Sequence, residues 1–370
     1  MDKHLHIISF DVPLPANYGG IIDVFYKLKA LHELGVKVHL HAFYYEGKNQ
    51  PTKELENYCD EVSYYKRSTG FLKFLTRKDP YIVSSRADKE LLKNLKKDDY
   101  PILFEGLHTT AFLNNPELKQ RTTLVRAHNI EHEYYAELGR NASGLKERYY
   151  KTETSRLQKY EAVLKNADVI LSISKAEVEH FQNHTKTIFI PAFYNDEKRG
   201  EVAETGNYVL FHGNLGVEEN ENAVRVILGE LGNKLKSKLI VAGANPSQKL
   251  RGFITSFSNT ELKENPDEIM MKELIQTAKV NVLYAEKSAG VKLKLIHALN
   301  LGGHAVINDA LNDQGMFSEV CKVTEKQELL QEVQELLTRD YSDNEIEFRD
   351  AFMRKNFNNL ANASKILELI

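Results

Sequence analysis

Short apolar runs alternate with amphipathic stretches along most of the chain. The runs are typical of strands buried on both faces of a sheet, and the stretches between them repeat apolar residues with the period of a helix. In the stretch 21–34, for example, Ile21, Val24 and Leu28 fall on one face, and Gly35 follows as a helix stop. Strand–helix alternation of this kind predicts parallel sheets covered by helices on both faces.

The runs predict strands in two groups, separated by a polar, glycine-punctuated segment. The first group is residues 5–10, 36–44, 61–65, 102–104, 122–127, 169–173 and 187–190. The second is residues 208–212, 239–242, 254–256, 280–284 and 305–307, with helices at 220–231, 266–278, 292–301 and 325–337.

Two groups of alternating elements predict two domains, and 370 residues suit two cores of roughly 150 residues each. We expect an N-terminal domain at 1–195, a linker at 196–207, a C-terminal domain at 208–343 and closing helices at 344–370 that pack back on the first domain. The predicted fold class is α/β, with two Rossmann-like doubly wound domains facing a central cleft. Ligands of such sheets bind at the carboxyl ends of the strands.

The composition narrows the class of protein. A charged fraction of 27%, a hydrophobic fraction of 42% and a net charge of −3 are typical of a globular protein and argue against a nucleic-acid partner. Cys59 and Cys321 form no disulfide or zinc pattern, which favours a reducing compartment. No apolar run approaches the ~18 residues of a transmembrane segment. We therefore expect a cytoplasmic protein, for which contact with a membrane surface stays open.

Two candidate sites follow strands of the first domain. Gly19 and Gly20 open the first predicted helix, where backbone N–H groups favour anionic oxygens, although a tight turn would also need glycine. The segment RAHNIEHE places His128, Glu131 and His132 after the strand at 122–127. It matches the zinc-protease pattern His-x-x-Glu-His, but it also fits a donor or acceptor site or a polar helix start. A zinc pair needs both histidines on one helix face and His128 falls in a turn, so we favour the donor or acceptor site.

Two further candidates lie in the second domain. Gly213 and Asn214 follow the strand at 208–212, where glycine lets a ligand approach the backbone, although a structural turn is an alternative explanation. The segment AGVKLKLIHAL opens a helix with lysines, which would fit a solvated basic helix start. Because lysines there oppose the helix dipole, we favour an anionic ligand such as a diphosphate. Its candidate ligand-binding residues are Gly290, Lys292, Lys294 and His297. No Asp-x-Asp follows a strand, so we expect no metal and no cofactor beyond the ligand itself.

Together these segments resemble the family 4 glycosyltransferases of the GT-B fold, over nearly the whole chain. Asn17-Tyr18-Gly19-Gly20 is similar to the family's glycine loop, and RAHNIEHEYY to the His-Asn-x-Glu segment of a bacterial branch. FHGN resembles its F-x-G-x loop, and GVKLKLIHA its G-x-R-x-K-x-L-E-A segment. The order and spacing of the segments carry the resemblance.

The resemblance implies a retaining, metal-independent hexosyltransferase. It would move a sugar from a nucleotide-diphosphate donor to a glycan or lipid-linked acceptor, in bacterial surface glycan synthesis. His128 and Glu131 would be catalytic, with His128 reaching the sugar or acceptor, while Lys292 and Lys294 would lie near the phosphates.

The chain departs from the family's pattern at two carboxylates. His297 stands where the family has the glutamate that binds the donor ribose, and Ala289 where the wider family has a second glutamate. The Arg-and-Lys pair of many members is also missing from 213–223. A binding protein with a decayed site is therefore one alternative, and a nucleotide-sugar epimerase on the same fold is another.

Overall fold

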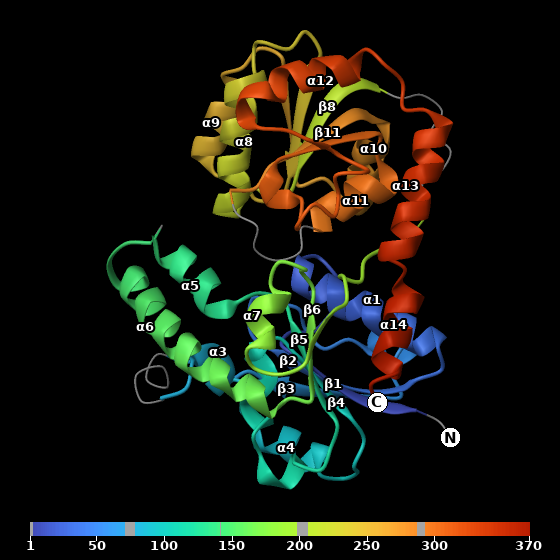
Figure 1. Cartoon of the computed structure of the whole chain (residues 1–370). Helices are drawn as coiled ribbons and strands as arrows, with labels where there is room; N and C mark the ends of the chain where they lie inside the picture. Colours follow the sequence, from blue (N-terminus) through green and yellow to red (C-terminus); the bar gives the residue numbers. More distant parts are fainter. Residues whose placement is uncertain (1–2, 71–77, 141, 198–205, 287–292) are drawn as a thin grey trace. The chain divides into compact units, whose positions relative to one another are not determined.

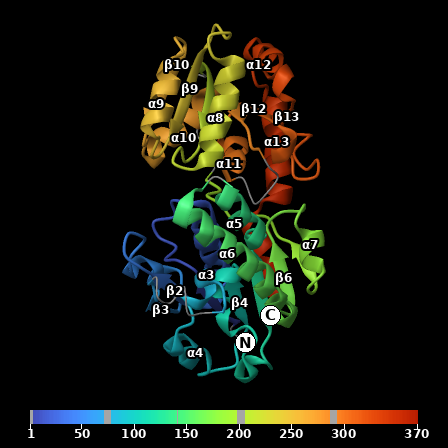
Figure 2. The same cartoon turned by 90° about the vertical axis from the view of Figure 1, so that its left-hand side faces the viewer.

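The computed structural model describes residues 3–70, 78–140, 142–197, 206–286 and 293–370. They form two compact units (Figures 1 and 2). Unit 1 consists of the described parts of Met1–Tyr194 and Asn358–Ile370, and unit 2 of those of Asn195–Ser288 and Lys292–Phe357. The two expected closing helices are therefore divided between the units: α13 (Asp343–Asn356) belongs to unit 2, and α14 (Asn359–Leu367) to unit 1.

Unit 1 contains a parallel sheet in the order β3-β2-β1-β4-β5-β6-β7 among the described residues. Every strand expected in this half is present. The strands are β1 (His4–Ser9), β2 (Lys37–Tyr44), β3 (Glu61–Lys66), β4 (Ile102–Glu105), β5 (Thr123–Ala127), β6 (Val169–Ser172) and β7 (Thr187–Phe189). The α-helices are α1 (Gly19–Glu33), α3 (Tyr81–Ser84), α4 (Lys89–Leu95), α5 (Glu131–Arg140), α6 (Gly144–Tyr160), α7 (Val178–Gln182) and α14. Short 3₁₀ turns are η1 (Lys53–Asn57), η2 (Leu107–Phe112), η3 (Pro116–Leu118) and η4 (Glu161–Asn166).

Alternate residues of these strands serve two separate cores. Ile7 and Leu124 lie in one cluster, whereas their neighbours Ile8 and Val125 lie in the other. Successive side chains of a strand point to opposite faces, so a strand buried on both faces must be apolar throughout. This is why the strands of unit 1 read as continuous apolar runs.

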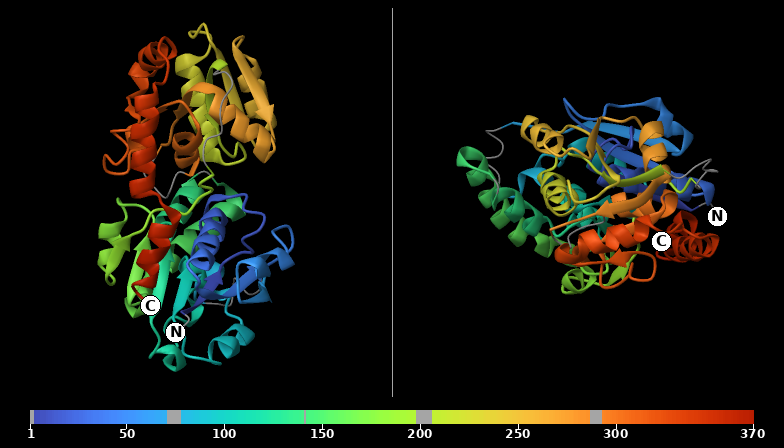
Figure 3. Two further views of the ribbon diagram at one scale, coloured as in Figure 1. Left: turned by 90° about the vertical axis from the view of Figure 1, so that its right-hand side faces the viewer. Right: turned by 90° about the horizontal axis from the view of Figure 1, so that it is seen from above.

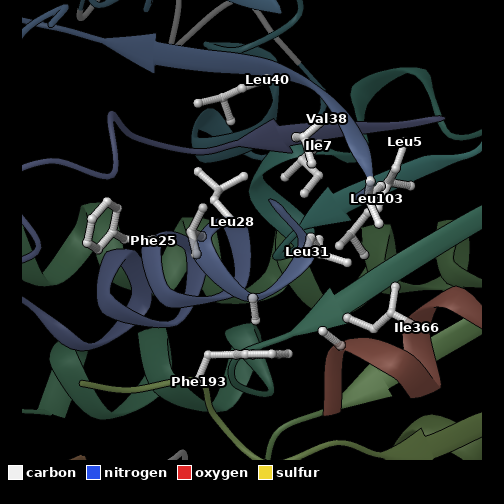
Figure 4. Close-up of a cluster of buried hydrophobic side chains, with 14 of the residues drawn as sticks. Leu5, Ile7, Phe25, Leu28, Leu31, Val38, Leu40, Leu103, Phe193 and Ile366 are labelled. Atoms are coloured by element: carbon white, nitrogen blue, oxygen red, sulfur yellow. The ribbon is translucent and has the colours of Figure 1, made fainter. Parts of the chain in front are cut away.

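Helices α1 and α14 cover one face of this sheet (Figures 1 and 3). Leu28 and Leu31 of α1 and Ile366 of α14 pack with the strand residues Ile7 and Leu103 (Figure 4). All of these side chains are buried, and each contributes roughly 1.5–3 kcal/mol of transfer free energy. The other face carries α3, α4 and the pair α5 and α6, which lie side by side (Figure 2).

Unit 2 contains a second parallel sheet in the order β10-β9-β8-β11-β12-β13. Its strands are β8 (Gly206–His212), β9 (Lys238–Gly243), β10 (Thr260–Glu264), β11 (Ala278–Leu283), β12 (His304–Ile307) and β13 (Lys322–Val323). Its helices are α8 (Glu218–Leu231), α9 (Gln248–Thr255), α10 (Glu268–Thr277), α11 (Leu293–Leu301), α12 (Leu329–Leu337) and α13, with 3₁₀ turns η5 (Asp309–Leu311) and η6 (Lys326–Glu328). Figure 2 shows β9 and β10 side by side with α8 and α9 next to them.

One predicted strand of unit 2 is wrong. Residues 254–256 lie at the end of α9, which begins after Ser247, whose side chain accepts a hydrogen bond from the Leu250 N–H. Leu250 and Ile254 are four residues apart and are both buried, so they form one turn-to-turn stripe of a helix. The strand itself is β10, whose sequence TELKE is half-exposed and too polar to stand out as an apolar run.

Each sheet reverses its strand order beside its first strand, between β1 and β4 in unit 1 and between β8 and β11 in unit 2. At such a point the loops leaving the carboxyl ends of neighbouring strands run in opposite directions and leave room for a ligand. The candidate residues that follow β8 and β11 therefore flank the reversal point of unit 2, and those that follow β5 lie one strand beyond the reversal point of unit 1, at the same carboxyl edge.

Candidate functional site

Glu105, the last residue of β4, accepts two buried hydrogen bonds at the carboxyl edge of the first sheet. Lys27 Nζ donates to Glu105 Oε1 over 2.6 Å and to Asp23 Oδ2 over 2.9 Å. The His128 imidazole, just beyond β5, places Nε2 3.0 Å from Glu105 Oε2. Lys27 and Glu105 are fully buried, so both charges depend on these partners.

Arg126 of β5 completes the network from the other side. Its guanidinium donates to both carboxylate oxygens of Asp23, at 2.7 and 3.1 Å, and to the carbonyl oxygens of Ile190 and Pro191. Burial alone would raise the pKa of Asp23, but Arg126 and Lys27 outweigh it and hold that pKa well below its usual range. Two cations thus balance two carboxylates in the interior of unit 1, and we call Asp23, Lys27, Glu105, Arg126 and His128 the edge network.

The edge network includes His128 but not His132, the two histidines of the zinc-protease pattern. His128 contacts Glu105, whereas His132 contacts Glu161 through Nδ1 at 2.6 Å. Among the described residues the two imidazoles belong to separate clusters. The pattern His128-x-x-Glu131-His132 therefore does not assemble a two-histidine zinc site, because His128 precedes α5 and lies off its helical face.

Glu131 opens α5 and is buried. Burial, and next the nearby Glu177 carboxylate, raise the pKa of Glu131 to about 8. Its Oε1 lies 3.7 Å from His108 Nδ1, too far for a hydrogen bond. A carboxyl group with this pKa is largely protonated at neutral pH and can donate a hydrogen bond or a proton.

The predicted glycines Gly19 and Gly20 form the first turn of α1, as expected. A Cβ at Gly20 would lie 2.7 Å from the Phe10 ring, so a larger residue there would have to displace that ring, and packing alone gives a reason for the glycine. The same ring meets His128 edge-on, with ring centroids 5.6 Å apart. Close approach of a ligand at Gly20 remains a prediction.

In unit 2, Gly213 and Asn214 leave β8 and turn toward α8. The Asn220 side chain donates to the Asn214 carbonyl oxygen at 2.9 Å, which fixes this loop to the first turn of α8. Gly243, at the end of β9, was not singled out from the sequence. A Cβ there would lie 1.8 Å from the Gly213 carbonyl oxygen, so only glycine permits the two strand ends to approach.

Lys294 lies in the first turn of α11, as predicted, and reaches back to the same loop. Its Nζ donates to Asn220 Oδ1 over 2.8 Å and to the Tyr284 carbonyl oxygen over 3.2 Å. Nζ also lies 5.4 Å from the centroid of the Phe211 ring. Gly290 and Lys292, and with them Ala289, lie outside the described residues.

Two imidazoles accompany Lys294 in unit 2. His212 ends β8 and His297 lies one turn beyond Lys294 on α11. Both Nε2 atoms are buried, and within the described ranges neither has a hydrogen-bond partner. Burial lowers the pKa of His212 to about 3 and that of His297 to about 4, so both rings are neutral near pH 7. Unit 2 therefore holds unmet hydrogen-bonding capacity next to a lysine, at the carboxyl edge of its sheet.

Sequence reasoning missed most of the edge network and a second histidine cluster. Asp23, Lys27 and Glu105 meet only through the fold, although a glutamate closing the buried strand ILFE was a detectable signal. The second cluster brings His132, His180 and His184 to Glu161. Its signal was the His-x-x-x-His spacing of His180 and His184, a spacing found in zinc sites.

Known proteins resemble this chain more in structure than in sequence. No protein-family model matches the chain. An uncharacterized 44.6 kDa protein in the cps region of Klebsiella pneumoniae is 27% identical over 316 residues, which is 79% of this chain and 79% of that protein. Among solved structures, TarM superimposes with a TM-score of 0.71 at 12% identity, covering 100% of this chain and 99% of that one.

A second solved structure is Anabaena Alr3699/HepE in complex with UDP and glucose. Its TM-score is 0.69 at 13% identity, with 98% of each chain covered. These structural neighbours are GT-B glycosyltransferases. The chain has the GT-B fold. The predicted α/β class with two Rossmann-like domains is thereby confirmed, while membership of family 4 remains a prediction.

None of the helices in the described parts of the chain combines the length and the apolar character that a bilayer crossing requires.

Proposed function

We propose that this protein is a glycosyltransferase that takes a sugar from a nucleotide-diphosphate donor bound in unit 2. The observation that carries the proposal is the grouping of Lys294 with the buried, partnerless Nε2 atoms of His212 and His297. The GT-B fold supports it, since the Anabaena neighbour has been solved with UDP-glucose. A cation beside unmet hydrogen-bonding groups suits a phosphorylated, hydroxyl-rich ligand.

Different residues of unit 2 would bind different parts of the donor. Lys294, with Lys292, would stabilise the negative charge that develops on the leaving diphosphate, without a metal at the phosphates. Gly213 would let the backbone approach the donor beside Asn214. His297, neutral near pH 7, would hydrogen-bond a donor hydroxyl in place of the carboxylate that the resemblance leads us to expect.

The edge network of unit 1 would position the group that works on the sugar or acceptor. Glu105 fixes His128 through Nε2, and the described residues provide no hydrogen-bond partner for His128 Nδ1. That nitrogen would meet the sugar or the acceptor hydroxyl. Glu131, with its raised pKa, would serve as a nearby neutral carboxyl group. That the two domains face a shared cleft remains a prediction from the sequence.

We further propose a retaining, hexosyl-type transfer to a glycan or lipid-linked acceptor in surface glycan synthesis. The retaining outcome and the acceptor come from the family resemblance. The role in surface glycan synthesis gains support from the relative in the Klebsiella cps region.

Calorimetric titration of the full chain with UDP-, GDP- and ADP-sugars tests the proposal. We expect one of them to bind with a one-to-one stoichiometry and to be consumed only when an acceptor is present. Absence of binding to the whole panel would overturn the enzyme assignment. Conversion of the sugar without an acceptor, with the nucleotide still attached, would instead assign an epimerase. Binding without turnover, with every candidate acceptor, would assign a binding protein.

A further inference from the structure

Glu161 lies at the centre of a histidine cluster in unit 1 that the edge network does not use. His132 Nδ1 lies 2.6 Å from Glu161 Oε2, and His184 Nε2 lies 3.2 Å from Glu161 Oε1. His180 Nε2 also contacts Glu161 Oε1. The Glu161 side chain is only 6% exposed, whereas that of His180 is 30% exposed. The carboxylate is thus buried, but the cluster can be reached from solvent.

Three separate elements supply these groups. His132 is in the first turn of α5, Glu161 begins η4, and His180 is on α7. His184 follows one turn after His180, and the chain keeps its turn there through the His184 N–H, which donates to the Phe181 carbonyl oxygen. This turn keeps His184 close to His180, and both imidazoles contact the same carboxylate oxygen.

Unit 1 offers two sets of groups whose donor atoms all lie within 4.8 Å of one another, and the sets differ in charge. In the set Asp23, Glu105 and His128, the carboxylates already bind Lys27 and Arg126. In the set His132, Glu161 and His180, the described residues give Glu161 only imidazole partners. A buried carboxylate surrounded by imidazoles is a donor set for a cation, whereas the edge network is already neutralised.

We propose that His132 Nδ1, His180 Nε2 and the Glu161 carboxylate bind a divalent transition-metal ion of the Zn²⁺ type. Two imidazoles and one carboxylate form a common zinc ligand set, and a fourth position would be left for water. Mg²⁺ and Ca²⁺ prefer all-oxygen sites and would not compete. His184 would hold Glu161 in place by its hydrogen bond, as outer-shell partners of zinc ligands do.

The proposal differs from the expectation that the chain binds no metal, and it does not depend on the proposed function. An ion here would tie the first turn of α5 to η4 and α7. Because His128 and Glu131 immediately precede or begin α5, the ion would be a positioning element for them within unit 1. It would leave donor binding in unit 2 unchanged.

The test uses the full chain without a histidine tag, stripped with a chelator and then dialysed with ZnCl₂. We expect mass spectrometry to find one zinc ion per chain after this dialysis, and no bound magnesium when MgCl₂ replaces ZnCl₂. Glu161→Gln and His180→Ala should each weaken zinc binding at least about 100-fold, since each removes a ligand, and His184→Ala should weaken it about 10-fold. The control His32→Ala removes an exposed histidine of α1 and should leave zinc binding unchanged.

Cobalt gives a readout that does not depend on whether the variants fold. The wild-type chain with one equivalent of CoCl₂ should show the intense visible absorption of a four-coordinate site, and zinc should displace it. Circular dichroism identifies any variant that is unfolded. Absence of the cobalt spectrum, or zinc retained equally by wild type and a folded Glu161→Gln variant, would overturn the proposal.

Discussion

The edge network of unit 1 and the two histidines beside Lys294 in unit 2 differ in how completely their polar groups are satisfied. In unit 1, Lys27 and Arg126 are matched by Asp23 and Glu105 through hydrogen bonds of 2.6 to 3.1 Å. In unit 2, the corresponding edge carries His212 and His297, whose buried Nε2 atoms have no hydrogen-bond partner among the described residues.

This difference distinguishes a region that positions side chains from a region that can bind a ligand. A buried network of paired charges is rigid, and Glu105 holds His128 in place through its Nε2. A buried polar atom without a partner destabilises the fold by about 1–3 kcal/mol, a cost that a ligand can offset by supplying the hydrogen bond. We therefore assign positioning to the edge of unit 1 and donor recognition to the edge of unit 2.

The largest effect should come from opening the edge network. Lys27→Met leaves Asp23 and Glu105 buried with one cation fewer, which should lower the free energy of unfolding of unit 1 by about 3–5 kcal/mol. Lys29→Met, on the exposed face of the same helix, is the matched control and should change it by less than about 0.5 kcal/mol. Urea unfolding followed by circular dichroism measures both, and equal midpoints would show that the network adds no stability.

Glu131 should make the stability of unit 1 fall as the pH rises through neutrality. Its pKa is about 8 in the folded chain and near 4.5 when unfolded, so the folded state binds more protons between these values. Stability should therefore fall as the pH rises above 4.5 until Glu131 is ionised above pH 8, and roughly 3 kcal/mol of this loss should fall between pH 6 and 9. Glu131→Gln should abolish this loss in thermal unfolding between pH 6 and 9, whereas Glu133→Gln, exposed on the same helix, should keep it. The same slope in both variants would remove Glu131 as its source.

His128→Ala should reduce turnover rather than donor affinity. Under the proposed function, kcat should fall about 100-fold, as for the loss of a positioned proton-transfer group, while the donor Kd stays within a factor of about two. His128→Gln keeps a donor near Glu105 but cannot exchange a proton. If His128→Gln restores kcat, the imidazole only positions its neighbours; if Kd rises as much as kcat falls, His128 belongs to donor binding.

In unit 2 the unpaired imidazoles should produce the opposite pH dependence. The pKa of His212 is about 3 in the folded chain, below its ordinary value of 6.5, so only the unfolded chain takes up this proton between these pH values. Stability is thus fully present above pH 6.5 and should fall by roughly 2.7 kcal/mol by pH 4.5. In thermal unfolding, His212→Leu should reduce this loss of stability in acid, and His32→Leu should not. If the loss is unchanged in His212→Leu, other titratable groups cause it.

The strands of both sheets could be predicted wherever they are buried on both faces, as at residues 5–10 and 169–173, because burial demands a continuous apolar run. The prediction failed where an edge strand is polar, as in β10, and where β13 is only Lys322–Val323. Those strands form through pairing with a neighbour, which leaves little trace in their own sequence.

The candidate site could be predicted in part for a related reason. His128, Gly213 and Lys294 follow strands, and position after a strand is readable from the sequence. Their partners Lys27, Glu105 and Asn220 come from distant segments, so only the fold brings them together. The absence of a partner at His212 Nε2 is likewise a property of the folded interior that no local pattern encodes.

The central claim is that unit 2 binds the donor at Lys294, and one titration tests it most directly. Wild type, Lys294→Ala and Lys236→Ala are titrated calorimetrically with the nucleotide sugar that the wild type binds. Lys236 is an exposed lysine before β9, at the opposite edge of the same sheet. We predict a Kd at least tenfold weaker for Lys294→Ala, about 1.4 kcal/mol, and an unchanged Kd for Lys236→Ala. An unchanged Kd in a folded Lys294→Ala variant would contradict the assignment of the donor site.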